Sequence, residues 1–182
     1  MSRSTDSTGT LTVPVGPQDH VRGPATAPIT LVEYGDFQCP SCREAYPIVK
    51  QVQEQLGDRL RFAFRNFPLT RIHQNAQHAA EAAEAAAAQG AFWQMHDRLF
   101  ERQFALEDEN LLEYARELGL DADRLGGELA AGTHRARVRE HFLSGVKSGV
   151  NGTPTFFING VRHDGGYDLP TLLGALKAAL ER

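Results

Sequence analysis

Residues 29–42 have the sequence ITLVEYGDFQCPSC. The first six residues are mostly β-branched, aliphatic or aromatic and are followed by Gly35, which is typical of a buried strand that ends at a turn. From Pro40 onward, apolar residues recur at spacings of three and four, which predicts a helix that ends at Gly57. Cys39 and Cys42 therefore stand where a strand passes into the first turn of a helix.

The rest of the chain continues this alternation and then departs from it. A second predicted strand at 59–67 follows the helix, and a strand, helix, strand order favours a parallel pair with a crossover helix. After a long helical region, the chain returns to strand-forming residues around an Asn159-Gly160 turn signal. The predicted helices cover 79–89, 92–103, 108–118, 121–131, 134–147 and 169–180, and the late strands 155–158 and 161–163. The pattern predicts an α/β fold with an inserted block of helices.

Length and charge limit the kinds of partner. The 182 residues are the size of one domain. The 19 basic and 23 acidic residues leave a net charge of -4, so we expect neither a nucleic-acid nor a membrane partner. No run approaches the roughly 18 apolar residues of a membrane-spanning helix. Residues 1–10 lack the apolar segment of a secretory signal, so we expect a cytoplasmic protein as numbered, and a periplasmic or extracytoplasmic one if a leader was removed.

Residues 1–28 contain four prolines and many Ser, Thr and Gly residues. This composition predicts a flexible N-terminal leader, in which Leu11–Val13 can form a short edge strand. We expect residues 29–69 and 149–182 to form the α/β domain. Residues 70–148 are expected to form the helical insertion.

The two cysteines are the only ones in the chain, and their spacing suits redox chemistry. A thiol becomes a nucleophile when it ionises, and a helix N-terminus favours the anion through its free N–H groups and its dipole. We expect Cys39, at that position, to react with a partner's sulfur. Cys42, one turn further along, would resolve the mixed disulfide.

Other interpretations of the cysteine pair remain open. Two residues at this spacing cannot form a disulfide framework, and they cannot by themselves complete a zinc site. They can instead be two buried thiols that pack as small apolar groups, or two ligands for a soft ion such as Cu(I). A redox-gated binding module or holdase, in which the pair reports oxidation, is a further alternative. His73 and His78 do not share a helix face well, so we expect no metal there.

Two further residues are candidates for the same site. Pro154 follows Thr153 at the start of a predicted strand, where a proline needs a positional reason. A cis Thr153–Pro154 bond and a trans proline that begins a strand fit the residues equally well. Glu33 lies six positions before Cys39. If Glu33 is buried beneath the cysteines, its pKa would be raised and it could exchange protons with Cys42. If Glu33 lies at an exposed edge, its pKa would be ordinary and it would have no role in proton exchange.

Four segments together resemble a known family. They are residues 33–42 (EYGDFQCPSC), 65–69 (RNFPL), the Ala-rich helix followed by 89–96 (QGAFWQMH), and 152–160 (GTPTFFING). In these motifs and in their order the chain resembles the DsbA-like thiol:disulfide oxidoreductases of the thioredoxin superfamily. The resemblance covers about residues 15–182.

The resemblance implies a thioredoxin fold with an inserted helical subdomain and assigns roles to the motif residues. Cys39 matches the attacking thiol, Cys42 the resolving thiol and Glu33 the buried acid. Thr153 and Pro154 match the cis-proline loop, which with Pro40 and Ser41 faces the substrate. Such enzymes need no bound cofactor. Their partners are proteins or peptides that carry thiols or disulfides, and a redox partner that the sequence does not identify.

The chain departs from the family pattern in two respects. The strongly oxidising exported members have Pro-His between the cysteines, whereas this chain has Pro40-Ser41. Because Ser41 has no imidazolium charge, we expect a weaker oxidant with a less depressed Cys39 pKa. The second departure is the missing export signal. A cytosolic glutathione pool of roughly −220 to −320 mV would hold an ordinary dithiol reduced, so reductase or redox-defence activity is as consistent with the sequence as oxidase activity.

Overall fold

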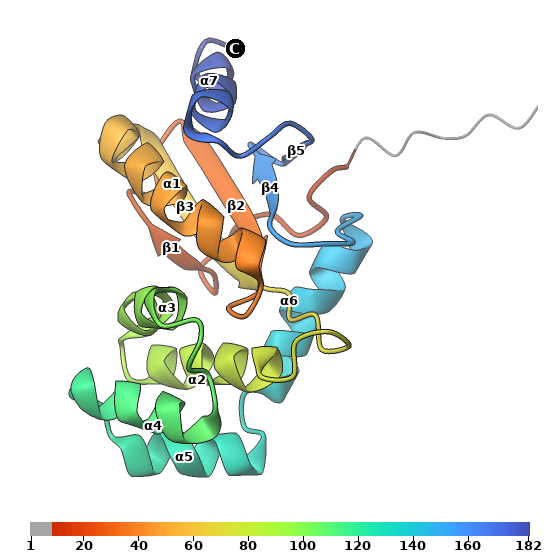
Figure 1. Cartoon of the computed structure of the whole chain (residues 1–182). Helices are drawn as coiled ribbons and strands as arrows, with labels where there is room; N and C mark the ends of the chain where they lie inside the picture. Colours follow the sequence, from red (N-terminus) through yellow and green to blue (C-terminus); the bar gives the residue numbers. More distant parts are fainter. Residues whose placement is uncertain (1–8) are drawn as a thin grey trace, which may run out of the picture.

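Five strands form one mixed sheet in the computed structural model, which describes residues 9–182 (Figure 1). The strands are β1 (His20–Arg22), β2 (Ile29–Gly35), β3 (Leu60–Asn66), β4 (Thr155–Ile158) and β5 (Val161–His163), in the order β1-β3-β2-β4-β5. β2 and β3 are parallel and joined through α1 (Pro40–Leu56), which confirms the predicted crossover. β4 and β5 form the predicted antiparallel hairpin. Its turn residues, Asn159 and Gly160, both have the positive φ that such turns favour.

Helices cover both faces of the sheet. α1 and α7 (Leu169–Leu180) pack together on one face, where their apolar residues meet those of β2 and β3 (Figure 1). α6 (Arg135–Lys147) lies on the other face and packs against β3. α6 can approach the sheet closely because Gly145 has no side chain. A Cβ atom at this position would lie 2.8 Å from the ring of Phe67 and 3.0 Å from the ring of Tyr34. Both faces of the central strands are therefore buried.

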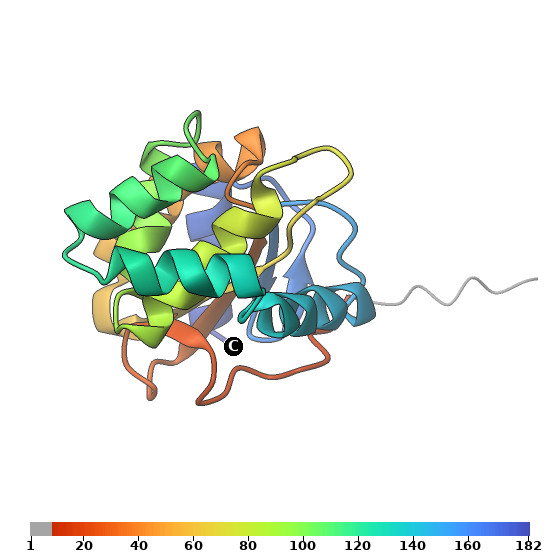
Figure 2. The same ribbon diagram turned by 90° about the horizontal axis from the view of Figure 1, so that it is seen from below.

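Four helices from the region between β3 and β4 form a bundle at one end of the sheet (Figures 1 and 2). They are α2 (Ala76–Ala88), α3 (Phe92–Glu101), α4 (Asp108–Glu117) and α5 (Ala122–Ala131). α2 is central because its many alanines are small, and α3, α4, α5 and α6 all pack against it. The predicted helices are confirmed with small changes at their ends. Among residues 9–182 no helix has both the length and the apolarity to cross a membrane.

The N-terminal segment differs from the sequence-based expectation in the position of its strand. The strand lies at His20–Arg22, where it pairs with β3, and not at Leu11–Val13. Near the expected position, Thr10 forms an isolated bridge to Val161 instead of part of a strand. The N–H of Leu11 donates to the carbonyl oxygen of Gly160 at 2.9 Å, and the N–H of Thr12 donates to Ser148 Oγ at 3.0 Å. β5 has only three residues with which an N-terminal strand could pair, whereas β3 has seven. Residues 1–8 of the expected leader lie outside the described residues.

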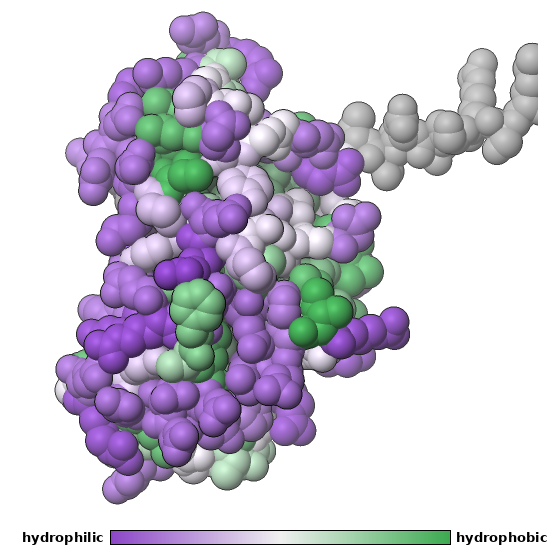
Figure 3. Space-filling model, viewed as in Figure 1, coloured by the Kyte–Doolittle hydropathy of each residue, from purple (hydrophilic) through white to green (hydrophobic). Residues whose placement is uncertain are grey.

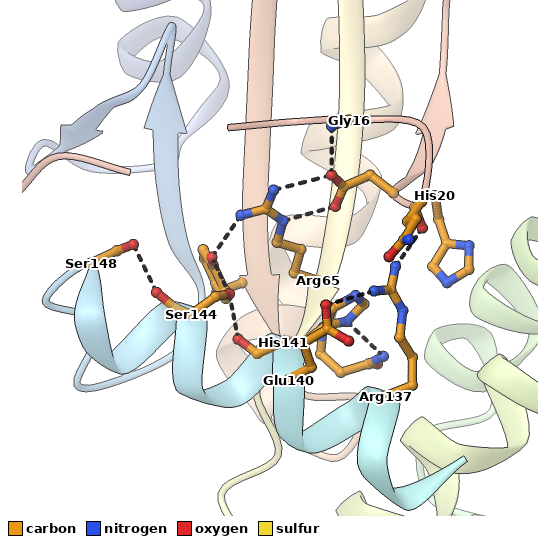
Figure 4. A network of polar contacts seen from close by, with 12 residues as sticks. Gly16, His20, Arg65, Arg137, Glu140, His141, Ser144 and Ser148 are labelled. Atoms are coloured by element: carbon orange, nitrogen blue, oxygen red, sulfur yellow. Dashed lines mark hydrogen bonds and ion pairs between the residues drawn. The ribbon is translucent and has the colours of Figure 1, made fainter. Parts of the chain in front are cut away.

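A network of buried hydrogen bonds and ion pairs connects the N-terminal segment to the rest of the fold (Figure 4). Asp19 accepts from Arg65 of β3 at 2.8 Å, and Arg65 is only 2% exposed. The Arg65 guanidinium also donates to the Tyr34 hydroxyl at 2.9 Å, which lies 2.8 Å from Ser144 Oγ of α6. His20 bonds Glu84 of α2 in the same region. The network therefore links the N-terminal segment, the sheet, α6 and the helical insertion.

Candidate active site

The two cysteines lie at the junction of β2 and α1, as predicted. Cys39 is the N-cap residue of α1, in extended conformation, and Pro40 is the first helical residue. The N–H of Cys39 donates to the carbonyl oxygen of Asp36 at 3.1 Å, which closes the turn between strand and helix. Both cysteines are free thiols; Cys42 is fully buried and Cys39 is 6% exposed. Cys39 is thus the sulfur nearer to solvent.

The surroundings of Cys39 favour its thiolate. Donation from the Cys42 thiol, together with the N–H groups of Cys42 and Ser41 and the Thr153 side chain, lowers the pKa of Cys39 to about 5 against the opposing effect of burial. Thr153 Oγ1 has no other partner among the described residues, so its hydroxyl is free to donate to the sulfur anion. Free N–H groups at a helix start are a known cause of acidic cysteines. At neutral pH Cys39 is therefore ionised.

Cys42 has the opposite character. Burial raises its pKa well above the usual value, and its hydrogen bond to Cys39 and the nearby Glu33 charge act in the same direction. The N–H of Asp36, which lies 3.5 Å from Cys42 Sγ, acts in the opposite direction. The pair therefore consists of one acidic and one weakly acidic thiol. This asymmetry fits an attacking and a resolving sulfur.

Glu33 is buried within the sheet beneath the cysteines. It is 3% exposed and lies opposite Phe64 of β3 and Phe156 of β4, so aromatic rings flank it on both sides. Burial, and next the negative charge of Cys39, raise the pKa of Glu33 to about 8. Its Oε1 has no hydrogen-bond partner among the described residues. The alternative of an exposed edge glutamate is wrong, because β4 and β3 cover the strand on both sides.

The Thr153–Pro154 bond is cis, so of the two alternatives that the residues left open the cis form is present. The Cys39 thiol lies 3.5 Å from the carbonyl oxygen of Thr153, which brings this loop directly against the reactive sulfur. Pro154 and Ser41 are partly exposed and Pro40 is exposed. The sequence-predicted residues around the cysteines therefore meet at one surface, although they come from distant parts of the chain.

The sequence interpretation missed Asp36, which organises the loop before Cys39. Its side chain is 1% exposed. One carboxylate oxygen accepts from the N–H of Gln38 at 2.7 Å, and the other accepts from the N–H of Leu69 at 2.9 Å and pairs with His73 Nδ1 at 2.8 Å. His73 thus has a structural partner. An acidic residue just after a strand is too common a pattern to have revealed this role.

The sequence interpretation also missed Gln103, which reaches the cysteine loop from the helical insertion. It lies in the connection between α3 and α4 and is 7% exposed. Its Nε2 donates to the carbonyl oxygen of Cys39 at 2.8 Å and to that of Phe37 at 2.9 Å. The sequence placed Gln103 at the end of the predicted helix 92–103, and nothing in the helical pattern indicated a contact with the cysteine loop. Among the described residues no cluster of three or more His, Cys, Asp or Glu residues could hold a metal ion.

Comparisons with known proteins agree with this geometry. A sequence model of the family described as Thioredoxin matches residues 16–178. A thioredoxin-like oxidoreductase from Silicibacter pomeroyi is 28% identical and superposes with a TM-score of 0.81 over 92% of this chain and 95% of that one. Oxidised BdbD of Bacillus subtilis superposes with a TM-score of 0.80 at 24% identity, covering 96% and 94% of the two chains. At that identity, the likeness to BdbD concerns the fold alone.

Two curated relatives are named for a different activity, Na⁺/H⁺ exchange. The chain is 49% identical over 170 residues to the Na(+)/H(+) antiporter NhaA 1 of Salinispora arenicola, which covers 93% of this chain and 26% of that protein. It is 43% identical over 170 residues to the Na(+)/H(+) antiporter NhaA of Herminiimonas arsenicoxydans, covering 93% and 27%. The chain therefore spans about a quarter of the length of the curated relatives that it matches.

Proposed function

The chain belongs to the thioredoxin family and has the fold of DsbA-like thiol:disulfide oxidoreductases, and from this premise we propose that it exchanges disulfides with protein or peptide substrates through Cys39 and Cys42. The proposal rests mainly on the geometry around the two thiols. An acidic thiol at the start of α1 lies against a cis-proline loop, and a second, weakly acidic thiol is hydrogen-bonded to it.

In the reductive direction, the Cys39 thiolate attacks one sulfur of the substrate disulfide. The substrate S–S bond breaks, a Cys39–substrate disulfide forms, and the other substrate sulfur leaves as a thiolate. Cys42 then loses its proton and attacks Cys39 Sγ. The products are the Cys39–Cys42 disulfide and the second substrate thiolate. Two electrons pass from the dithiol to the substrate, and the oxidative direction is the reverse of these steps.

Glu33 is proposed to accept the proton of Cys42 at the second step. While Cys39 is a thiolate, its negative charge helps to keep Glu33 protonated. Formation of the mixed disulfide removes that charge, so the pKa of Glu33 falls, although burial still raises it, and the carboxyl group ionises more readily when Cys42 must lose its proton. The same change removes one of the contributions that raise the pKa of Cys42. The buried acid therefore responds to the state of Cys39.

We propose that the substrate contacts Pro40, Ser41, Thr153 and Pro154. These residues surround Cys39 and are exposed or partly exposed. The sulfur lies 3.5 Å from the Thr153 carbonyl, so a peptide bound to Cys39 would lie along the backbone of this loop. In this proposal residues 29–69 and 149–182 act as the catalytic domain, and residues 70–148 extend its substrate surface.

The direction of exchange depends on the reduction potential. Ser41 adds an N–H group at the sulfur but no cationic charge, so we propose a weaker oxidant than the Pro-His members. A potential near about −270 mV would indicate a reductase and one near about −120 mV a disulfide donor. An oxidase would act outside the cytoplasm and a reductase within it. Equilibration with glutathione buffers of known potential, read by alkylation of the free thiols, gives this value.

Turnover tests the proposal itself. The chain should accelerate the reduction of insulin by dithiothreitol, and Cys39→Ser should abolish the acceleration. Cys42→Ser should still attack but accumulate a Cys39–substrate disulfide, which a non-reducing gel detects. If wild-type chain neither accelerates insulin reduction nor reacts with a small aromatic disulfide, the proposed function is wrong.

The curated relatives favour a second candidate function, a redox-gated module that acts on a Na⁺/H⁺ antiporter. The observation behind it is the 49% identity to a quarter of such a protein. In this case the dithiol state would change the rate of ion exchange without catalytic turnover of other proteins. Na⁺/H⁺ exchange in vesicles containing the antiporter, measured with the chain reduced, oxidised or carrying Cys39→Ser, distinguishes the two. A redox-dependent change in exchange, combined with no insulin reduction, would favour the second candidate.

A further inference from the structure

A small pocket lies between α6, α2 and the connection from β3 to α2. Its volume is about 280 Å³, just below the range of about 300–1,000 Å³ for pockets that hold drug-sized ligands. Pro68, Val138 and Phe142 give the pocket apolar walls, and Arg135 and Arg139 bring two guanidinium groups to it. The pocket therefore suits one side chain or one small anion.

The two arginines of this pocket have no acidic partner in the protein. They stand four residues apart on α6, so they lie on one face of the helix, and both are exposed. Among residues 9–182 neither side chain has an ion pair or a hydrogen bond. Arg137, on another face of α6, differs because it forms an ion pair with Glu140. The positive charge at the pocket is thus left uncompensated in a chain whose net charge is -4.

The chemistry of the pocket fits an acidic side chain. A guanidinium group offers parallel N–H donors that match the two oxygens of a carboxylate. An aspartate or glutamate side chain also has one or two methylene groups, which can contact Val138 and Phe142 while the carboxylate meets the arginines. Thr70 adds a hydroxyl group at the pocket wall. We therefore consider a carboxylate on a polypeptide as the ligand.

Hydrogen bonds connect the wall of the pocket to the cysteine loop. Leu69, between Pro68 and Thr70, donates its N–H to the Asp36 carboxylate at 2.9 Å. The carbonyl oxygen of Asp36 in turn accepts from the N–H of Cys39 at 3.1 Å. An extended chain advances about 3.3–3.6 Å per residue, so about four or five residues of a bound peptide reach from Cys39 to the pocket. Figure 3 shows strongly hydrophilic side chains beside an apolar group where Figure 1 draws the β3–α2 connection next to α6.

We propose that the pocket of Arg135 and Arg139 binds an acidic side chain of the polypeptide whose sulfur reacts with Cys39. The inference rests on the proposed function and names a substrate class for it: cysteines with Asp or Glu a few residues away in an extended segment. Opposite charges accelerate encounter and favour one orientation of the bound partner. The pocket therefore selects among cysteines by their acidic neighbours.

A set of paired peptides tests this proposal. Each peptide has a single cysteine and carries either Glu or Gln at one of positions two to six before or after it. The cysteine is prepared as a mixed disulfide with thionitrobenzoate. When Cys39 attacks the peptide sulfur, this S–S bond breaks, a Cys39–peptide disulfide forms, and the coloured thionitrobenzoate leaves as a thiolate. Its release gives the second-order rate constant.

The ratio of the rate constants for the Glu and Gln peptides is the quantity to compare, because a general loss of activity cancels in it. For wild-type chain at low ionic strength we expect a ratio of about five at the best position, falling towards one in about 0.5 M NaCl. The double variant Arg135→Gln, Arg139→Gln should have a ratio near one. Replacing both arginines with lysine should keep the ratio above one, since the charges remain.

The double variant Arg116→Gln, Arg182→Gln is the matched control. Both arginines are exposed and without an ion-pair partner among residues 9–182, and neither lines the pocket. This variant loses the same two charges, so its ratio should equal that of wild type. A ratio near one at every position in wild type, a ratio that persists without Arg135 and Arg139, or an equal loss in the control would each overturn the proposal.

These outcomes are separate from a failure of the proposed function. A chain that reacts with the Glu and Gln peptides at equal rates is an oxidoreductase without this subsite. A chain that reacts with no peptide of the set, nor with insulin, has no exchange activity.

Discussion

Replacing Glu33 with glutamine is expected to stabilise the reduced protein increasingly as pH rises. The pKa of this carboxyl is about 8 in the folded chain and 4.5 when it is unperturbed. A group whose folded pKa is raised favours folding fully below its unfolded pKa, and this contribution is lost as pH rises through the folded pKa. The contribution of Glu33 to the stability of the wild-type chain is therefore lost between about pH 4.5 and pH 8, and Glu33→Gln lacks this loss.

The size of the effect follows from the two pKa values. Each pH unit between them corresponds to about 1.4 kcal/mol. The difference in the free energy of unfolding between variant and wild type should thus grow by roughly 3–4 kcal/mol from about pH 5 to about pH 8. The buried amide of glutamine has its own cost, but that cost does not depend on pH. The slope with pH, rather than the value at one pH, is the quantity to compare.

Urea unfolding at a series of pH values, with a phosphine reductant present, measures this slope. Glu54→Gln is the matched control, because Glu54 is an exposed residue of α1 and its substitution should change stability by less than about 0.5 kcal/mol at every pH. In the oxidised protein Cys39 carries no charge, so the rise should be smaller. A difference between Glu33→Gln and wild type that stays constant from about pH 5 to pH 8 would refute the reasoning, since Glu33 would then have an ordinary pKa.

Three further substitutions, the first with its own control, test the packing of α6, the buried ion pair and the contact of Gln103 with the cysteine loop. Gly145→Ala should lower the free energy of unfolding by about 1–3 kcal/mol, because its methyl group would meet two aromatic rings. Gly127→Ala, at an exposed position of α5 with open space around it, should raise the free energy of unfolding by about 0.5–1 kcal/mol. Equal effects of the two substitutions in urea unfolding would contradict this. Asp19→Ala should cost about 3–5 kcal/mol at neutral pH by leaving Arg65 buried without its carboxylate. Because the pKa of Asp19 is lowered from 3.8 in the folded chain, the penalty should begin to shrink as pH falls below 3.8 and should be lost only below the lowered folded pKa. A penalty that persists in stronger acid would show that the ion pair is not its cause. Gln103→Leu should cost about 1–3 kcal/mol, since it removes the donor to two buried carbonyl groups, and unchanged thermal unfolding would exclude this role.

Local sequence patterns were sufficient for the elements of the fold. The helix after Cys39, the parallel strand pair and the Asn159-Gly160 hairpin were predicted correctly because periodicity, turn residues and breakers act over a few positions. The same patterns failed for the N-terminal strand. Val21 and its neighbours pair with β3, and a three-residue strand has too little periodicity to stand out from its surroundings.

The candidate site was predictable in part for the same reason. Cys39 and Cys42 are adjacent in sequence to the strand and helix that position them, so their place could be inferred from residues 29–56. Glu33 and Pro154 were candidates whose environment the residues left open. Burial of Glu33 depends on β3 and β4 on either side, and the conformation of Pro154 depends on what its loop meets.

The sequence by itself thus determined the order of strands and helices and the nature of the reactive group. Only the tertiary structure decided that Glu33 is buried with a raised pKa, and that Gln103 and Asp36 hold the cysteine loop. The physical reason is separation along the chain: Gln103 and Cys39 are far apart in sequence, and hydrogen bonds and desolvation at such distances arise only when packing brings the groups together.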